Sequence, residues 1–126
     1  MDYRLEVVVV PVADVDRAKD FYEAKMGFNV DHDTSPAEGV RVVQLTPPGS
    51  ACSIVIGTGL APMEPGSVKG LQLVVTDMDA AVADLSGRGV DLGEVQELGP
   101  PDSSGYKFVF LNDPDGNAWA VQEIRP

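Results

Sequence analysis

The sequence predicts an α+β fold made of two βαβββ modules, and the first observation behind this prediction is an internal repeat. The segment Val12–Ala18 (VADVDRA) is echoed half a chain later by Val75–Ala81 (VTDMDAA). Each copy follows a hydrophobic run and opens an amphipathic stretch that ends near a glycine. A repeat of this length indicates two copies of one supersecondary unit, each too small to bury its own apolar face.

The second observation is the order of hydrophobic runs, which is the same in both halves. The first half begins with a strand at 5–12 that is covered on both faces. A helix follows, which begins after Asp14 and ends at Gly27, and three more strands lie at 28–31, 40–45 and 52–56. In the second half, the helix begins after Asp77 and the strands lie at 71–75, 90–95, 106–111 and 117–124. We therefore expect one domain, 1–126, with modules at about 1–60 and 68–126 whose sheets form a curved cup.

Length and composition limit the class of protein. A chain of 126 residues and 13.3 kDa fits a single domain. The start is acidic, unlike a signal peptide, and the longest apolar run, 7–13, is too short to span a bilayer. Cys52 is the one cysteine, so the chain has no intrachain disulfide. We expect a cytoplasmic protein without a membrane partner.

The charge is strongly acidic, with 20 acidic against 9 basic residues and a formal net charge of -11. Phosphate backbones and anionic lipid surfaces are repelled by such a surface, so nucleic acid is excluded as a partner. Acidity either maintains solubility or attracts a cationic small molecule.

Several motifs span nearly the whole chain together: the repeat, Phe21-Tyr22 with Gly27-Phe28, and Phe110–Asn117 (FLNDPDGN). With these motifs in this order, the sequence resembles the vicinal oxygen chelate superfamily, which includes glyoxalase I, extradiol dioxygenases and bleomycin-resistance proteins. The resemblance is what carries the following expectations. It implies paired βαβββ modules, a cup between their sheets and a homodimer. We interpret the Asp113-Pro114-Asp115-Gly116 turn as structural, linking two strands.

In the metal-dependent members, carboxylate and imidazole ligands converge on a divalent ion that polarises the substrate. The resemblance places these ligand positions at Val7, within Gly70–Gln72 and at Ala120. None carries an ionisable ligand, and valine, glycine and alanine side chains offer no donor at all. We therefore expect no metal and no cofactor.

Other catalytic groups are equally sparse, and we assign no catalytic residue. His32 is interpreted as a solvated strand-end residue, or else as an acid, base or ligand contact at a cleft rim. Cys52 begins an apolar strand and is interpreted as a small buried side chain. Trp119 and the pair Phe108 and Phe110 are either core residues or a ligand platform, because alternate strand residues point to opposite faces.

What remains is a cup with an apolar floor and a few amides. If Ala120 faces inward, so does Gln122, and the same parity on the first strand aligns Val7 with Val9. Arg41 adds one positive charge. The predicted ligand-binding residues are Val7, Val9, Gln44, Gln72, Tyr106, Phe108, Trp119, Ala120 and Gln122.

Such a pocket suits a bulky, partly aromatic or cationic organic molecule. The bleomycin-resistance branch of the resemblance implies sequestration of an antibiotic or natural product in a cleft at the dimer interface, without a metal. The alternative is a lyase, isomerase or oxygenase acting on a small oxygenated substrate, with Glu6, His32 or Tyr106 transferring protons or a metal held elsewhere. A third hypothesis is a purely structural or regulatory dimerisation module.

Overall fold

The computed structural model describes residues 1–100 and 105–126, and in this part of the chain the βαβββ order occurs twice. The first module consists of β1 (Val7–Val9), α1 (Val15–Asp20), a π-helical turn (Phe21–Lys25), β2 (Asn29–Ala37), β3 (Val40–Thr46) and β4 (Ser53–Thr58). The second consists of β5 (Leu71–Val75), α2 (Met78–Gly87), β6 (Gln96–Glu97), β7 (Lys107–Asn112) and β8 (Ala118–Glu123). The predicted α+β class with two such modules is confirmed.

Each module forms its own mixed four-stranded sheet. The strand orders are β1-β4-β3-β2 and β5-β8-β7-β6, so the two sheets are arranged alike. β1 pairs in parallel with β4, and β5 with β8, while the remaining pairs are antiparallel. The parallel partners are the first and last strands of each module, so the helix and the two middle strands form the long connection that a parallel pair requires.

Both helices begin where the sequence predicts, because an aspartate caps each of them. The Asp14 carboxylate accepts a hydrogen bond from the Arg17 amide at 3.1 Å, and the Asp77 carboxylate accepts one from the Ala80 amide at 3.1 Å. The α2 terminus gains a second acceptor, since Glu123 accepts a hydrogen bond from the Met78 amide at 2.8 Å. These bonds satisfy amides that otherwise lack an intrahelical partner.

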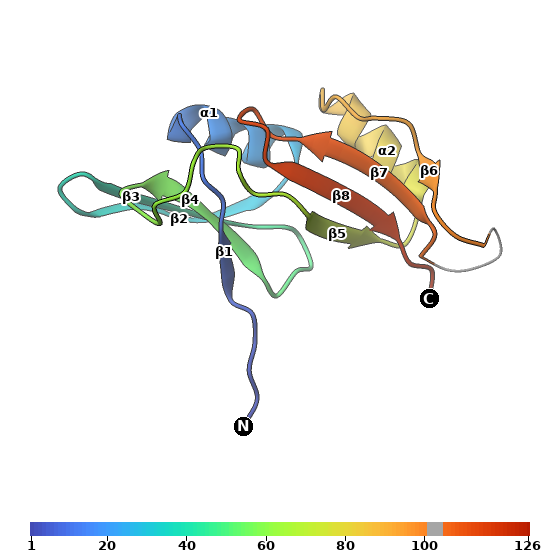
Figure 1. The fold of residues 1–126 in the computed structure, drawn as a ribbon, viewed down its shortest axis with the longest axis horizontal. Coiled ribbons are helices and arrows are strands. Elements are labelled where there is room, and N and C mark those ends of the chain that lie inside the picture. The colour runs from blue at the N-terminus through green and yellow to red at the C-terminus, as the bar shows by residue number, and fades with distance from the viewer. Residues whose placement is uncertain (101–104) are drawn as a thin grey trace.

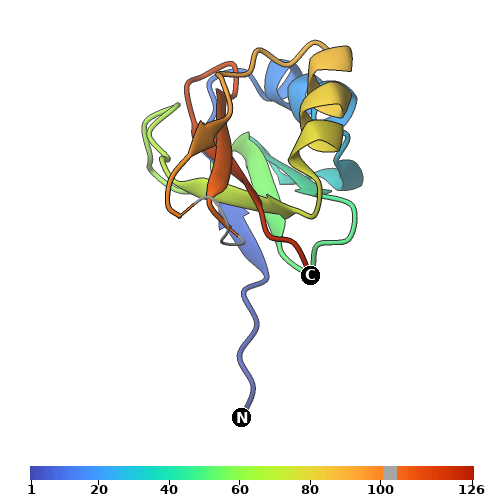
Figure 2. The same ribbon diagram turned by 90° about the vertical axis from the view of Figure 1, so that its right-hand side faces the viewer.

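One hydrophobic core joins the two modules. Both helices lie on the same side of the molecule, above the sheets in Figure 1, and the turned view shows the same arrangement (Figure 2). The ring of Trp119 from β8 lies 5.7 Å from that of Tyr22 and 5.8 Å from that of Phe28, measured between centroids. These contacts connect the core of the first module to that of the second.

Three predicted strands differ from those observed. The strand expected at 28–31 continues to Ala37, so His32 lies within β2 and not at a strand end. The run 5–12 forms only the short edge strand β1, and the preceding residues extend away from the molecule, with Leu5 70% exposed (Figure 1). This strand is therefore not covered on both faces as predicted. The strand expected at 90–95 is not observed there; β6 begins just after that run and has two residues, and Val90 is a buried core residue in the loop after α2. Within the described residues, the helices are all too short or too polar to traverse a bilayer.

Candidate ligand-binding site

Each sheet turns one face toward its helix and leaves the other face open. On the second sheet, strand register aligns Gln72, Ala120 and Phe110 in one row across β5, β8 and β7. A neighbouring row consists of Val74, Gln122 and Phe108. Paired residues share a face of the sheet, and their chain neighbours Val109, Leu111 and Val121 are buried in the core. The two rows therefore lie on the open face.

We call the open-face set Gln72, Phe108, Phe110, Ala120 and Gln122 the platform. The rings of Phe108 and Phe110 are nearly parallel, with centroids 6.2 Å apart and an interplanar angle of 8°. Phe110 is 40% exposed. Ala120 lies beside Phe110 in the register and has too small a side chain to fill the surface between the aromatic pair and the amides. The platform is thus a broad apolar surface that a flat molecule can cover.

The two glutamines form the polar edge of the platform. The Gln72 amide nitrogen donates to the Gln122 amide oxygen at 2.5 Å, and the Gln122 amide nitrogen donates to the Gly105 carbonyl at 2.8 Å. Because both hydrogen-bonding ends of the Gln122 amide are occupied, its orientation is fixed. The Gln72 side chain, which is exposed, retains its carbonyl oxygen as an acceptor that faces solvent.

The platform belongs to a larger exposed apolar patch. Val74 is 56% exposed, and Leu98 and Ile124, which are bonded through their backbones to Tyr106 and Val75, are 53% and 42% exposed. Monomeric proteins rarely leave such side chains grouped in water, so an exposed patch of this kind marks an interface or a ligand-binding surface.

The first sheet has a matching open face with a different composition. Register aligns Val9, Val55, Gln44 and His32 across all four strands, and Val7 pairs with Ser53 one row away. Val7, Val9 and Gln44 therefore share one face, as their parity predicts. His32 is exposed at the edge strand β2. This face combines aliphatic side chains with one amide and has no aromatic ring in these rows.

The platform does not include Tyr106 or Trp119, which were also predicted to bind the ligand, and it does not include the charged side chain of Arg41. Tyr106 precedes β7 and is buried, with the Lys107 ammonium 5.9 Å from its ring centroid. Trp119 points toward the helices, because it alternates with Ala120 along β8, and it is only 3% exposed. Arg41 forms ion pairs with Asp16 at 2.8 Å and Asp33 at 3.0 Å, so its charge is already neutralised.

The positions that correspond to metal ligands do not suit a divalent ion. Val7 lies in the first sheet, whereas Gln72 and Ala120 are register partners in the second. Of these side chains only Gln72 has a donor atom, a neutral amide oxygen that is a weak ligand by itself. In the described part of the chain, no group of three or more His, Cys, Asp or Glu residues is arranged to hold a metal.

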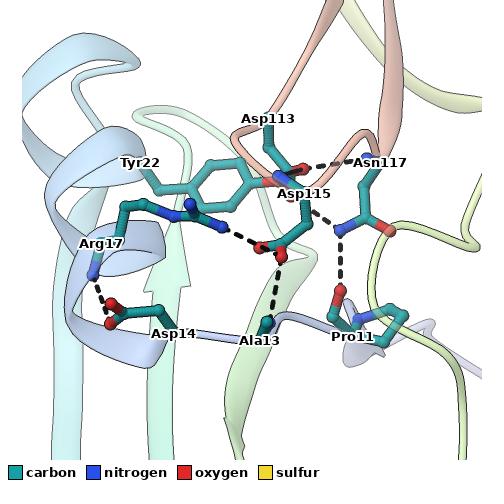
Figure 3. A network of polar contacts seen from close by, with 8 residues as sticks. All are labelled: Pro11, Ala13, Asp14, Arg17, Tyr22, Asp113, Asp115 and Asn117. Atoms are coloured by element: carbon teal, nitrogen blue, oxygen red, sulfur yellow. Dashed lines mark hydrogen bonds and ion pairs between the residues drawn. The ribbon is translucent and has the colours of Figure 1, made fainter.

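A polar network, which the sequence alone did not reveal, joins the β7–β8 turn to the start of α1 (Figure 3). The buried Asp113 carboxylate accepts hydrogen bonds from the Tyr22 hydroxyl and from the Asn117 amide nitrogen, each at 2.7 Å. Asn117 also donates to the Pro11 carbonyl at 2.8 Å. The turn was predicted to be structural, and it links not only two strands but also two modules.

Asp115 makes the second half of this link. Its carboxylate accepts from the Ala13 amide at 3.1 Å and pairs with the Arg17 guanidinium at 3.2 Å (Figure 3). Burial, and then the negative charge of Asp113, raise the pKa of Tyr22 well above its ordinary value. The Tyr22 hydroxyl therefore stays protonated and acts as the donor to Asp113.

A cleft of about 290 Å³, which we call the seam cleft, lies between β1 and β4 of the first module and β5 of the second. Its walls are mainly apolar and include Val8, Ile54 and Leu71 together with Trp119. Ser53 and Gln72 contribute polar groups to the same cleft. The structure thus brings the predicted residues Gln72 and Trp119 together here, although they lie on opposite faces of the second sheet.

With this geometry established, the chain can be compared with known proteins. The family model described as the Glyoxalase/Bleomycin resistance protein/Dioxygenase superfamily matches residues 4–121. The chain belongs to this superfamily, as the sequence motifs predict. No curated protein matches the chain.

Among solved structures, TnmS3, an antibiotic binding protein from Streptomyces sp. CB03234, is 33% identical with a TM-score of 0.81, covering 98% of this chain and 97% of that one. A glyoxalase/bleomycin resistance protein from the same organism is 34% identical with a TM-score of 0.77, covering 95% and 100%. UcmS2 is 25% identical with a TM-score of 0.79, covering 98% and 99%.

Proposed function

We propose that this protein binds a small organic molecule on the platform of the second sheet without a metal, and that it sequesters an antibiotic or natural product. The observation that carries the proposal is the stacked pair of the half-buried Phe108 and the exposed Phe110, which lies beside Ala120 and two hydrogen-bonded glutamines. Apolar area with a few fixed polar groups is typical of small-molecule sites. The likeness to a protein that binds an antibiotic supports the same reading.

The platform favours a flat ligand over a compact one. The two rings are parallel and stacked, and an aromatic ring of a ligand that stacks on this pair gains binding energy beyond the area that is buried. The exposed Gln72 amide supplies an acceptor at the edge. Because the protein carries a net charge of -11, a cationic ligand is attracted from a distance, and association is faster at low salt.

We propose further that a second copy completes the site. The open faces of both sheets are uncovered in one chain, and β1 and β5 are edge strands that each have one unpaired side. If the first sheet of a second copy covers the platform, its Val9 and Gln44 would form the opposite wall. A symmetric dimer also covers the patch around Val74 and Phe110, and it should bury at least about 1,000 Å².

Isothermal titration calorimetry with daunorubicin, a flat polycyclic antibiotic with a cationic amino sugar, and with its neutral aglycone tests the proposal. We expect both compounds to bind. The affinity for daunorubicin should fall as salt is added, because its amino group is charged, whereas the affinity for the neutral aglycone should not depend on salt. Phe110→Ala should weaken binding at least about tenfold, because it removes half of the aromatic pair. Ala120→Trp should fill the space beside that pair and abolish binding.

Ser86→Ala is the control, since Ser86 is exposed on α2, on the helix side of the molecule and away from the open faces of both sheets. It should leave the affinity unchanged, and so should dialysis against EDTA. If neither polycyclic compound binds and a thermal-shift screen yields only small anionic metabolites as stabilisers, the sequestration proposal fails. The same conclusion follows if Ala120→Trp retains the wild-type affinity.

A further inference from the structure

The seam cleft contains the end of a chain of hydroxyl groups that runs across the first sheet. The Ser53 hydroxyl on β4 lies 2.6 Å from the Thr46 hydroxyl on β3. Thr46 in turn donates a hydrogen bond to the carboxylate of Asp31 on β2. Ser53 is one of the few buried polar residues in the described structure, only 6% exposed, and it lines the cleft.

The carboxylate fixes the direction of every proton in this chain. A carboxylate accepts hydrogen bonds and donates none, so the single proton of Thr46 points to Asp31. Thr46 has no second proton for Ser53, and the hydrogen bond between them therefore uses the proton of Ser53. What Ser53 has left for the cleft is a pair of acceptor sites and no donor.

We propose that the seam cleft is a second binding site, which takes a small one- or two-ring apolar molecule that carries a hydrogen-bond donor, with Ser53 as its acceptor. The volume of about 290 Å³ lies below the range of drug-sized pockets, which limits the ligand to this size. This site goes beyond the proposed function, because its walls share only Gln72 with the platform and include neither Phe108 nor Phe110.

Burial of Ser53 makes this polarity selective. A ligand that enters the cleft excludes water from Ser53, and the acceptor then lacks a partner unless the ligand supplies a donor. A ligand that presents an acceptor instead places two lone pairs against each other. Sites that hydrogen-bond a specific ligand group reject analogues without that group more strongly than apolar pockets reject a change of size. The carboxylate at the far end of the chain increases the preference by polarising both hydroxyls.

Indole and benzofuran test the inference, because they have nearly the same shape and only indole has an N–H donor. The full chain, labelled with ¹⁵N, is titrated with each compound and followed in ¹H–¹⁵N correlation spectra. Trp119 is the one tryptophan of the chain and lines the cleft, so the single indole N–H signal of the protein reports occupancy directly. We expect indole to bind at least about fivefold more tightly than benzofuran, which is the effect of one net hydrogen bond.

Three variants separate the role of Ser53 from the effects of charge and folding. Ser53→Ala should reduce the affinity ratio of indole to benzofuran to about one. Asp31→Asn introduces a donor that can reverse the chain and let Ser53 donate, so the ratio should fall at least about threefold. Asp33→Asn is the matched control on the same strand, because its carboxylate binds Lys19 and Arg41 instead, and the ratio should stay at the wild-type value.

Equal affinities for the two compounds in the wild-type protein would overturn the inference. So would a ratio that survives in Ser53→Ala, a ratio that falls equally in Asp33→Asn, or binding that leaves the Trp119 signal unmoved. The spectra also show whether each variant is folded. Because these compounds are read at Trp119 and daunorubicin is tested through Phe110, either site can fail without the other.

Discussion

Replacing Tyr22 by phenylalanine tests whether the network between the modules stabilises the fold. The Tyr22 side chain is fully buried, and its hydroxyl both donates to the Asp113 carboxylate at 2.7 Å and accepts from the Trp119 indole N–H at 2.9 Å. Tyr22→Phe keeps the ring and its stacking against Phe28 but removes both hydrogen bonds. The change therefore isolates the polar link between the modules from the packing around it.

The expected loss of stability follows from these two bonds. A hydrogen bond to a charged group contributes about 1.5 to 3 kcal/mol, and a buried donor without an acceptor costs about 1 to 3 kcal/mol. In the variant, Asp113 still accepts a hydrogen bond from the Asn117 side chain, whereas the Trp119 N–H loses the Tyr22 oxygen as its acceptor. The sum is about 2.5 to 6 kcal/mol, a large part of the 5 to 15 kcal/mol that is typical of a native protein.

Urea denaturation followed by circular dichroism and by Trp119 fluorescence measures this loss. With a slope of about 2 kcal/mol per molar urea, the midpoint should fall by about 2 M, and the slope should not change. Tyr3→Phe is the matched control, because Tyr3 is 89% exposed in the N-terminal segment, and its midpoint should equal that of the wild type. A loss under about 1 kcal/mol for Tyr22→Phe would show that this network contributes little.

Three further predictions concern pH, backbone conformation and assembly. Folding raises the pKa of Tyr22, so above about pH 10 only the unfolded chain loses the hydroxyl proton, and the free energy of unfolding should fall by up to about 1.4 kcal/mol per pH unit. Urea titrations at several pH values measure this dependence, and Tyr22→Phe should lack the part that comes from Tyr22. The same pH dependence in both proteins would contradict the raised pKa. Gly66→Ala should lower the free energy of unfolding by at least about 3 kcal/mol in the same assay, because φ is +79° and the new Cβ would lie 2.0 Å from the Asp115 carbonyl oxygen. Gly39→Ala is the control, since φ is +75° but nothing lies near the new Cβ, and it should cost about 1 to 2 kcal/mol. Equal losses in the two variants would refute the clash at Gly66. Light scattering at micromolar concentration should give the mass of a homodimer, twice 13.3 kDa, and a monomer would count against the two-copy site.

The fold could be predicted from the sequence because its signals are local. Asp14 and Asp77 cap their helices through residues three positions away, and the strand at 71–75 ends where its hydrophobic run ends. Strands fixed by distant partners were predicted less well. β6 has two residues paired only with β7, and neither of them carries a hydrophobic pattern of its own.

The candidate site was predictable within a strand but not between strands. Alternation requires Ala120 and Gln122 to share a face, and by the same rule it excludes Trp119 from that face. Which residues of β5 and β7 lie beside Ala120 depends on register, which a single sequence does not specify for strands joined by long connections. Gln72 and Phe110 are its partners, and Phe110 was not among the nine residues selected.

The conformation of the turn between β7 and β8 depends on the first module, because Asp113 of the turn is hydrogen-bonded to Tyr22 of that module. Tyr22 lies 91 positions before Asp113, yet its hydroxyl donates one of the four hydrogen bonds that this buried carboxylate accepts from Tyr22, Asp115 and Asn117 (Figure 3). No lysine or arginine is among these partners. The turn joins β7 to β8, and these strands carry Phe110 and Ala120 of the platform. The hydrogen bonds that hold the turn against α1 and Pro11 therefore also fix where the platform lies relative to the first sheet. A buried, charged acceptor is costly when a partner is lost, so this geometry is defined more sharply by the polar network than by the apolar packing around it.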